Sequence, residues 1–161
     1  LYITSGYIMD RSKPIYAIRP GGEGDISLQG EETSNEYIVW SHPKAAPYNP
    51  STILYGDLMY VLLDRGTVAA YKASDGTVLS DQQRLETVSG GFTSSPWAYD
   101  GKVFYLSEAG VTYVIKVGET FEVIQRNPLA EDDLGMATPA IAGDRLLIRT
   151  SARVYCVRKG A

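Results

Sequence analysis

One short unit of two strands and a turn recurs along this chain at nearly constant spacing, and this repeat restricts the fold more than any other feature. Three turns built of Gly and Asp each precede a short apolar strand, at steps of 44 and 43 residues: Gly56-Asp57, Asp100-Gly101 and Gly143-Asp144. A further strand, rich in β-branched and aromatic residues and ending in a base, follows each of them: 68–72, 112–116 and 154–158. The N-terminal segments 1–4 and 15–19 fit the same two positions.

A period in the low forties, made of short strands without helical periodicity, is typical of β-propeller blades. The sequence therefore predicts an all-β fold, a β-propeller fragment of about three and a half four-stranded antiparallel blades. The expected units are 1–42 (incomplete), 43–92, 93–134 and 135–161 (incomplete). The runs 103–106 and 112–115 lack apolar and polar alternation, so both faces of these strands should be covered. We expect further blades of a longer chain to complete the ring.

The outer strand of each unit is the most weakly marked. It is expected at Tyr37 to Trp40 in the first unit, at Thr77 to Ser80 in the second and at Phe121 to Gln125 in the third. A Ser or Thr next to a Pro marks the innermost strand, as in Ser95-Pro96 and Thr138-Pro139. These positions complete a four-stranded reading of the two central units.

Charge and cysteine content exclude several classes of function. The net charge of −4, with no cluster of Lys and Arg, argues against a nucleic-acid partner or an anionic membrane surface. No run is long and apolar enough to predict a transmembrane segment, and no basic-then-apolar leader begins the sequence. Cys156 is the single cysteine, so an internal disulfide is ruled out, and its place in a strand predicts a small buried hydrophobe.

The segment 70–80, AYKASDGTVLS, resembles the repeat of pyrroloquinoline-quinone-like (PQQ-like) β-propellers, Ala-x-Asp-Ala-x-Thr-Gly-x-x-x-Trp. Ala70, Ala73 and Gly76 match that pattern. Three positions depart from it: Lys72, Asp75 and Ser80. In the family the final Trp docks one blade on the next; Trp40 stands at that point of the first unit, and Gln125 near it in the third.

The resemblance implies an exported protein, in the periplasm, the cell envelope or the medium. The family ranges from quinone-dependent alcohol and sugar dehydrogenases to an outer-membrane assembly lipoprotein. A dehydrogenase needs a complete ring, a quinone pocket, Ca²⁺ held by carboxylates and a catalytic Asp, and none of these can be carried onto a position of this chain. The preferred interpretation is a non-enzymatic scaffold that binds a protein or a glycan and carries no cofactor. The alternative is part of a quinoprotein oxidoreductase, with pyrroloquinoline quinone and Ca²⁺.

Several residues could carry chemistry, and each also has a structural explanation. His42 is the single histidine, so a Ser-His-Asp arrangement would depend on it, although a hydrogen-bonded loop histidine is favoured. Glu131-Asp132-Asp133 could bind Ca²⁺ or could be a solvated acidic loop. The run 21–25 could hold phosphate, but its acids favour a solvated turn. Phe92 and Trp97 are expected to pack between blades, with exposure toward a sugar or peptide as the alternative.

Propeller geometry predicts one functional face. The loop from an outer strand to the next inner strand, and the loop from the second to the third strand, emerge on the same side, and loops on a rigid scaffold commonly carry function. The residues predicted for this partner-binding loop face are His42, Tyr48, Asn49, Asp64, Arg65, Gly91, Phe92, Glu108 and Met136. They mix charged, amide and aromatic groups, as a binding surface would, and name no reaction.

Overall fold

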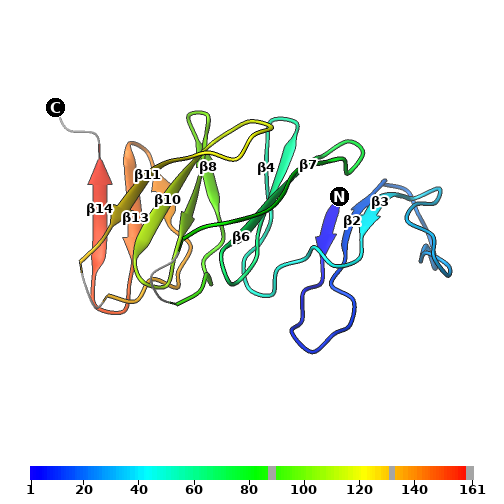
Figure 1. The fold of residues 1–161 in the computed structure, drawn as a ribbon, viewed down its shortest axis with the longest axis horizontal. Helices are drawn as coiled ribbons and strands as arrows, with labels where there is room; N and C mark the ends of the chain where they lie inside the picture. Colours follow the sequence, from blue (N-terminus) through cyan, green and yellow to red (C-terminus); the bar gives the residue numbers. More distant parts are fainter. Residues whose placement is uncertain (87–89, 131–132, 159–161) are drawn as a thin grey trace.

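The computed structural model describes residues 1–86, 90–130 and 133–158. Within these ranges the chain forms four antiparallel sheets and contains no helix, so the described part holds no helix that could cross a membrane. Figure 1 shows the four sheets following one another along the long axis of the molecule. The predicted all-β class is confirmed.

Each sheet is a meander of consecutive strands. The first sheet has the order β1 (Tyr2–Thr4), β2 (Ile15–Ile18), β3 (Ile38–His42). The second has the order β4 (Ile53–Tyr55), β5 (Leu58–Leu62), β6 (Thr67–Lys72), β7 (Val78–Arg84). The third has the order β8 (Trp97–Tyr99), β9 (Lys102–Leu106), β10 (Val111–Lys116), β11 (Val123–Pro128). The fourth has the order β12 (Ala140–Ala142), β13 (Arg145–Arg149), β14 (Val154–Arg158).

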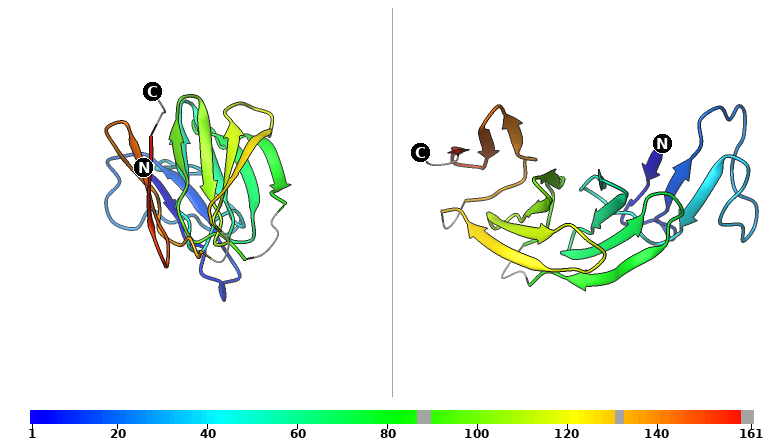
Figure 2. Two further views of the ribbon diagram at one scale, coloured as in Figure 1. Left: turned by 90° about the vertical axis from the view of Figure 1, so that its left-hand side faces the viewer. Right: turned by 90° about the horizontal axis from the view of Figure 1, so that it is seen from above.

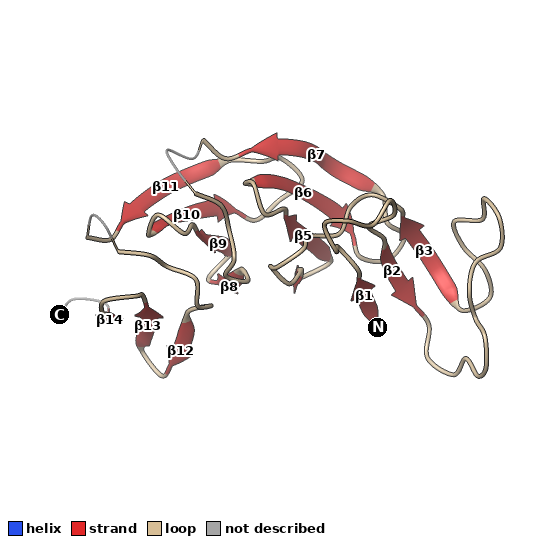
Figure 3. Ribbon diagram, turned by 90° about the horizontal axis from the view of Figure 1, so that it is seen from below, coloured by secondary structure: helices blue, strands red, loops and turns tan. Residues whose placement is uncertain are grey.

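The sheets stack face to face around an open arc. Figure 3 shows β7 and β11 along the convex rim and β8 and β12 nearer the concave side, and the right-hand view of Figure 2 shows the same curvature. This radial stacking of small antiparallel sheets is a partial β-propeller, as the repeat predicts.

Three apolar layers fill the spaces between neighbouring sheets. Along β5, Met59 and Val61 pack toward the first sheet, while Tyr60 and Leu62 pack toward Val103, Tyr105 and Ile115 of the third. The next layer joins the third and fourth sheets through Trp97, Leu106 and Ile148. Strands in the middle of the stack are therefore buried on both faces, which explains why their sequences do not alternate.

Trp40 and His42 fasten the first sheet to the second. The Trp40 Nε1–H donates to the carbonyl oxygen of Ala73 at 3.0 Å, and its ring lies against Gly76. His42 Nε2 lies 2.7 Å from the carbonyl oxygen of Gly76, and its ring packs on Tyr71. Trp40 thus docks one blade on the next, in the manner that the family resemblance implies.

Two details differ from the sequence expectations. The outer strands are displaced, since β7 extends to Arg84 and β11 begins at Val123; these strands carry mostly polar, exposed residues, so their pairing with β6 and β10 leaves little mark in the sequence. Cys156 is exposed, and the expectation of a buried residue was wrong. It pairs with Leu147 on β13, while the neighbours that pack on the third sheet are Leu146, Ile148 and Tyr155, so Cys156 lies on the other, uncovered face.

Candidate functional site

The hairpin turns between second and third strands meet the segments that connect neighbouring sheets, and repeated hydrogen bonds join them. The carbonyl oxygen of Asp64 accepts from the Phe92 N–H at 2.8 Å, and that of Glu108 accepts from the Gly135 N–H at 2.9 Å. At the equivalent place in the fourth sheet, the Ser151 N–H donates to the Leu134 carbonyl oxygen at 2.9 Å. These hydrogen bonds join the hairpin turns and the connecting segments along one edge of the second, third and fourth sheets.

The carboxylate of Asp64 organises the segment that enters the second sheet. Its Oδ2 accepts from the Tyr48 N–H and its Oδ1 from the Asn49 N–H, each at 2.9 Å, and Asn49 Nδ2 donates to Oδ1 at 3.2 Å. Three of the residues predicted for the loop face are thus in direct contact. The charge of Asp64 stabilises its own chain, and Tyr48 is held with its side chain exposed.

Glu108 performs the same task one blade further on. Its Oε2 accepts from the Gly91 N–H at 3.2 Å, and its Oε1 accepts from the hydroxyl of Thr93 at 2.5 Å. A ladder of hydroxyl groups runs beside these turns: the Ser51 N–H donates to Ser95 Oγ, which lies one repeat further along the chain. The Ser95 N–H donates in turn to Thr138 Oγ1, and both of these hydrogen bonds are 2.9 Å long. The recurrent Ser or Thr before the inner strand therefore has a structural purpose.

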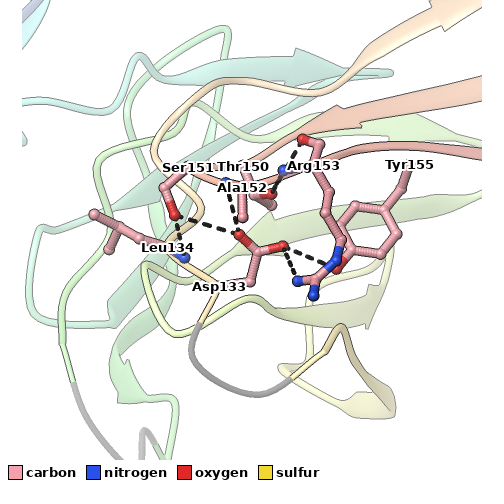
Figure 4. A network of polar contacts seen from close by, with 7 residues as sticks. All are labelled: Asp133, Leu134, Thr150, Ser151, Ala152, Arg153 and Tyr155. Atoms are coloured by element: carbon pink, nitrogen blue, oxygen red, sulfur yellow. Dashed lines mark hydrogen bonds and ion pairs between the residues drawn. The ribbon is translucent and has the colours of Figure 1, made fainter.

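Asp133 is fully surrounded by donors from the hairpin of the fourth sheet (Figure 4). Its Oδ2 accepts from the Tyr155 hydroxyl at 2.9 Å and from Arg153 Nη1 at 3.2 Å, while Oδ1 accepts from the Ala152 N–H at 3.2 Å and from Ser151 Oγ at 3.3 Å. Burial alone would raise the pKa of this carboxyl, but the hydrogen bonds outweigh burial and lower the pKa to about 2. The Asp133 carboxylate is therefore ionised, and both of its oxygens already accept hydrogen bonds from this hairpin.

Most of the acidic triplet considered for Ca²⁺ lies outside the described residues. Glu131 and Asp132 lie outside the described ranges, and Asp133 binds the hairpin. Across residues 1–86, 90–130 and 133–158, no three His, Cys, Asp or Glu side chains gather where they could hold a metal ion.

The other residues predicted for the loop face lie in different environments. Phe92 is only 1% exposed and packs against Tyr113 in the layer between the second and third sheets, so it is part of the core and is not available to a partner. His42 contacts Gly76 and Tyr71 at the first interface between sheets, which makes it a docking residue. Arg65 and Met136 have exposed side chains, and their role in binding stays a prediction.

The loop between β1 and β2 belongs to this surface, although sequence reasoning did not include it. Its tip, with Tyr48 beside it, forms an exposed apolar group, which we call the tip patch: Tyr7 (52% exposed), Ile8 (61%), Met9 (77%) and Tyr48 (50%). The ring centroids of Tyr7 and Tyr48 are 6.0 Å apart. In Figure 1 this loop projects from the lower edge of the molecule. Two signals in the sequence could have identified this loop: its length, and its place between segments 1–4 and 15–19, which fit the second and third strand positions of a blade.

The loop is fastened to the scaffold although its tip is exposed. A Cβ atom on Gly6 would lie 1.8 Å from the Pro47 carbonyl oxygen, so only glycine allows this close approach. The Lys13 N–H donates to the Pro43 carbonyl oxygen at 2.8 Å, and the Lys13 carbonyl oxygen accepts from the N–H groups of Ala45 and Ala46. Hydrogen bonds and close packing therefore fix the backbone on either side of the tip patch, whose apolar side chains remain exposed.

A hollow of about 690 Å³ lies on the opposite edge of the sheets, where the turns 56–57, 72–74 and 117–119 come together. Tyr2, Leu54 and Tyr55 also line it. The charged residues on its walls are Asp57, Lys72 and Glu119, and they form no cluster of catalytic or metal-binding groups.

The described residues define a class of protein by their fold: a partial β-propeller of four antiparallel sheets. No family model matches the chain, and no curated protein matches it in sequence. Solved structures do resemble it. BamB from Moraxella catarrhalis matches with a TM-score of 0.60 and 17% identity, over 75% of this chain and 36% of BamB. A europium-containing methanol dehydrogenase matches with a TM-score of 0.52 and 16% identity, over 78% of this chain and 22% of the enzyme.

These likenesses show the fold, and it is the fold that the PQQ-like resemblance of the segment 70–80 implies. This chain spans about a third of BamB and about a fifth of the dehydrogenase. Identity this low carries the architecture and not an activity.

Proposed function

We propose that this chain is a non-enzymatic binding module of a PQQ-like β-propeller protein, and that it engages a protein partner through its loop face. The tip patch carries this proposal. Four apolar or aromatic side chains, each at least half exposed, stand together on a bonded scaffold. Exposed apolar groups held in this way are typical of protein interaction sites, where Tyr and Met are enriched.

A protein partner is favoured over a glycan. Sugar sites combine an aromatic platform with free polar side chains, whereas Asp64 and Glu108 already accept hydrogen bonds from their own chain. Ile8 and Met9 add aliphatic surface, which suits apolar side chains of a protein. The family resemblance supports a periplasmic or cell-envelope location, where further blades of the parent chain would complete the ring.

Photo-crosslinking tests the proposal. A photoreactive amino acid replaces Tyr7 in the full-length protein, and a matched variant carries it at Tyr99, which is 65% exposed and precedes a turn on the opposite edge. We expect a discrete protein adduct from position 7 in envelope extracts, lost on Ile8→Ser, and no such adduct from position 99. The same adduct from both positions, or an adduct that does not depend on Ile8, would refute the proposal.

The second candidate is part of a quinoprotein oxidoreductase, and the fold likeness to methanol dehydrogenase supports it. The two candidates differ in what they bind. Saturable binding of pyrroloquinoline quinone with Ca²⁺ to the full-length protein would favour the oxidoreductase; under the binding-module proposal we expect neither to bind.

A further inference from the structure

Four basic residues belong to the segments that carry and hold the tip patch. Arg11 and Lys13 follow the tip in the same loop, and Lys44 pairs with Lys13 in a parallel β-bridge. Arg65 follows Asp64, whose carboxylate holds the backbone of Tyr48. The region is therefore locally basic in a chain whose net charge is −4.

These four charges have no acidic partner in the part of the chain that the structure describes. The ion pairs found in the described ranges all involve other bases: Lys102, Lys116, Arg126, Arg145 and Arg153. Of the two acids in the same segments, Asp64 is engaged by Tyr48 and Asn49, and Asp10 forms no ion pair among the described residues. The segments that carry the exposed apolar surface thus also carry positive charges that are unpaired among the described residues.

Resting on the proposed function, we infer that the partner segment is an acidic, apolar peptide. Its apolar side chains cover Ile8, Met9 and the Tyr7–Tyr48 pair, and its Asp and Glu side chains face Arg11, Lys44 and Arg65. Apolar contact at the centre with charges at the rim is the usual composition of a protein interface, and complementary rim charges accelerate and orient association. An anionic bilayer is disfavoured because the chain as a whole is acidic.

Fluorescence anisotropy with three labelled peptides tests this inference on the full-length protein. The peptides share one Leu- and Phe-containing core and differ in their flanks, which carry Glu, Gln or Lys. We expect the Glu peptide to bind most tightly, and added salt to weaken it selectively because these charges are exposed. The variant R11E/K44E should bind the Glu peptide about tenfold more weakly, as expected when two exposed attractive pairs become repulsive.

A matched variant, K102E/K116E, makes the same change of net charge on Lys102 and Lys116, which pair with each other at the end of the β9–β10 pairing near the opposite edge, and it should leave binding unchanged. Equal binding of the three peptides, or no binding by any of them, overturns the inference. Binding of phosphatidylglycerol vesicles in place of the peptides also overturns it and identifies a membrane surface. Ile8→Ser separates the two proposals. If the three peptides bind equally and Ile8→Ser abolishes their binding, the tip patch still binds protein and only the preference for an acidic partner is wrong.

Discussion

Replacing Gly76 with Ala tests the account of how neighbouring blades are joined. Gly76 has a φ of +73°, and a Cβ atom there would lie 2.7 to 2.9 Å from three ring carbons of Trp40. The left-handed backbone conformation costs about 1–2 kcal/mol for an L-residue, and overpacking a buried ring costs about 1–3 kcal/mol more. We therefore expect Gly76→Ala to lower the free energy of unfolding by about 2–5 kcal/mol, measured by urea denaturation.

Gly56 provides a matched control. Its φ is +60°, but a Cβ atom at this position would meet nothing within 4 Å. Gly56→Ala should therefore show only the backbone cost of about 1–2 kcal/mol. Combining Gly76→Ala with Trp40→Ala should destabilise by less than the sum of the single changes, because the clash disappears with the ring. Equal losses for the two glycine variants, or full additivity with Trp40→Ala, would refute the proposed contact.

Three further outcomes are expected. Tyr105→Phe should raise the free energy of unfolding by about 1 kcal/mol, because this buried hydroxyl has no hydrogen-bond partner in the described ranges. Tyr60→Phe should lower the free energy of unfolding by about 1 kcal/mol, because the Gly118 N–H loses its acceptor. Urea titrations that rank the two variants in the reverse order would contradict this. The pKa of Asp133 is about 2 in the folded protein, below the ordinary value of 3.8, so its contribution to stability is complete well above pH 4 and is lost progressively as the pH falls through 4 to 2. Unfolding measured from pH 5 to 2 should show a shallower acid limb in Asp133→Asn and an unchanged one in Asp144→Asn, at an exposed carboxylate. Ser95→Ala should cost about 0.5–1.5 kcal/mol in the same urea assay, because the Ser51 N–H loses its acceptor, and no change would remove the hydroxyl ladder from the account.

The repeat was readable from the sequence because it reflects local chemistry. Turns such as Gly56-Asp57 need particular residues, and strands such as β5 and β10 are buried on both faces, so their composition is constrained. The outer strands were placed less accurately because β11 is largely exposed and carries polar residues that also suit a loop.

The candidate site was only partly predictable for a different reason. The topology of a propeller placed Tyr48, Asn49 and Asp64 on one face, but it could not show that the Asp64 carboxylate is used by the chain itself. Phe92 was placed on this face by its position in a loop and was also expected to pack between blades; its side chain lies in the core between two sheets, so the packing expectation is confirmed. Side-chain direction and hydrogen-bond partners depend on contacts between distant segments, and a single sequence does not encode these as a local pattern.

The central claim is tested most directly by hydrogen exchange. It is measured on the full-length protein alone and in complex with the partner that crosslinking through position 7 identifies. The account predicts new protection in the loop 5–13 and in the segment 47–49, with no change at the turns 56–57 and 73–76 on the opposite edge. Protection at those opposite turns, with the loop 5–13 exchanging as in the free protein, would show that the partner binds another surface and would contradict the assignment of the loop face.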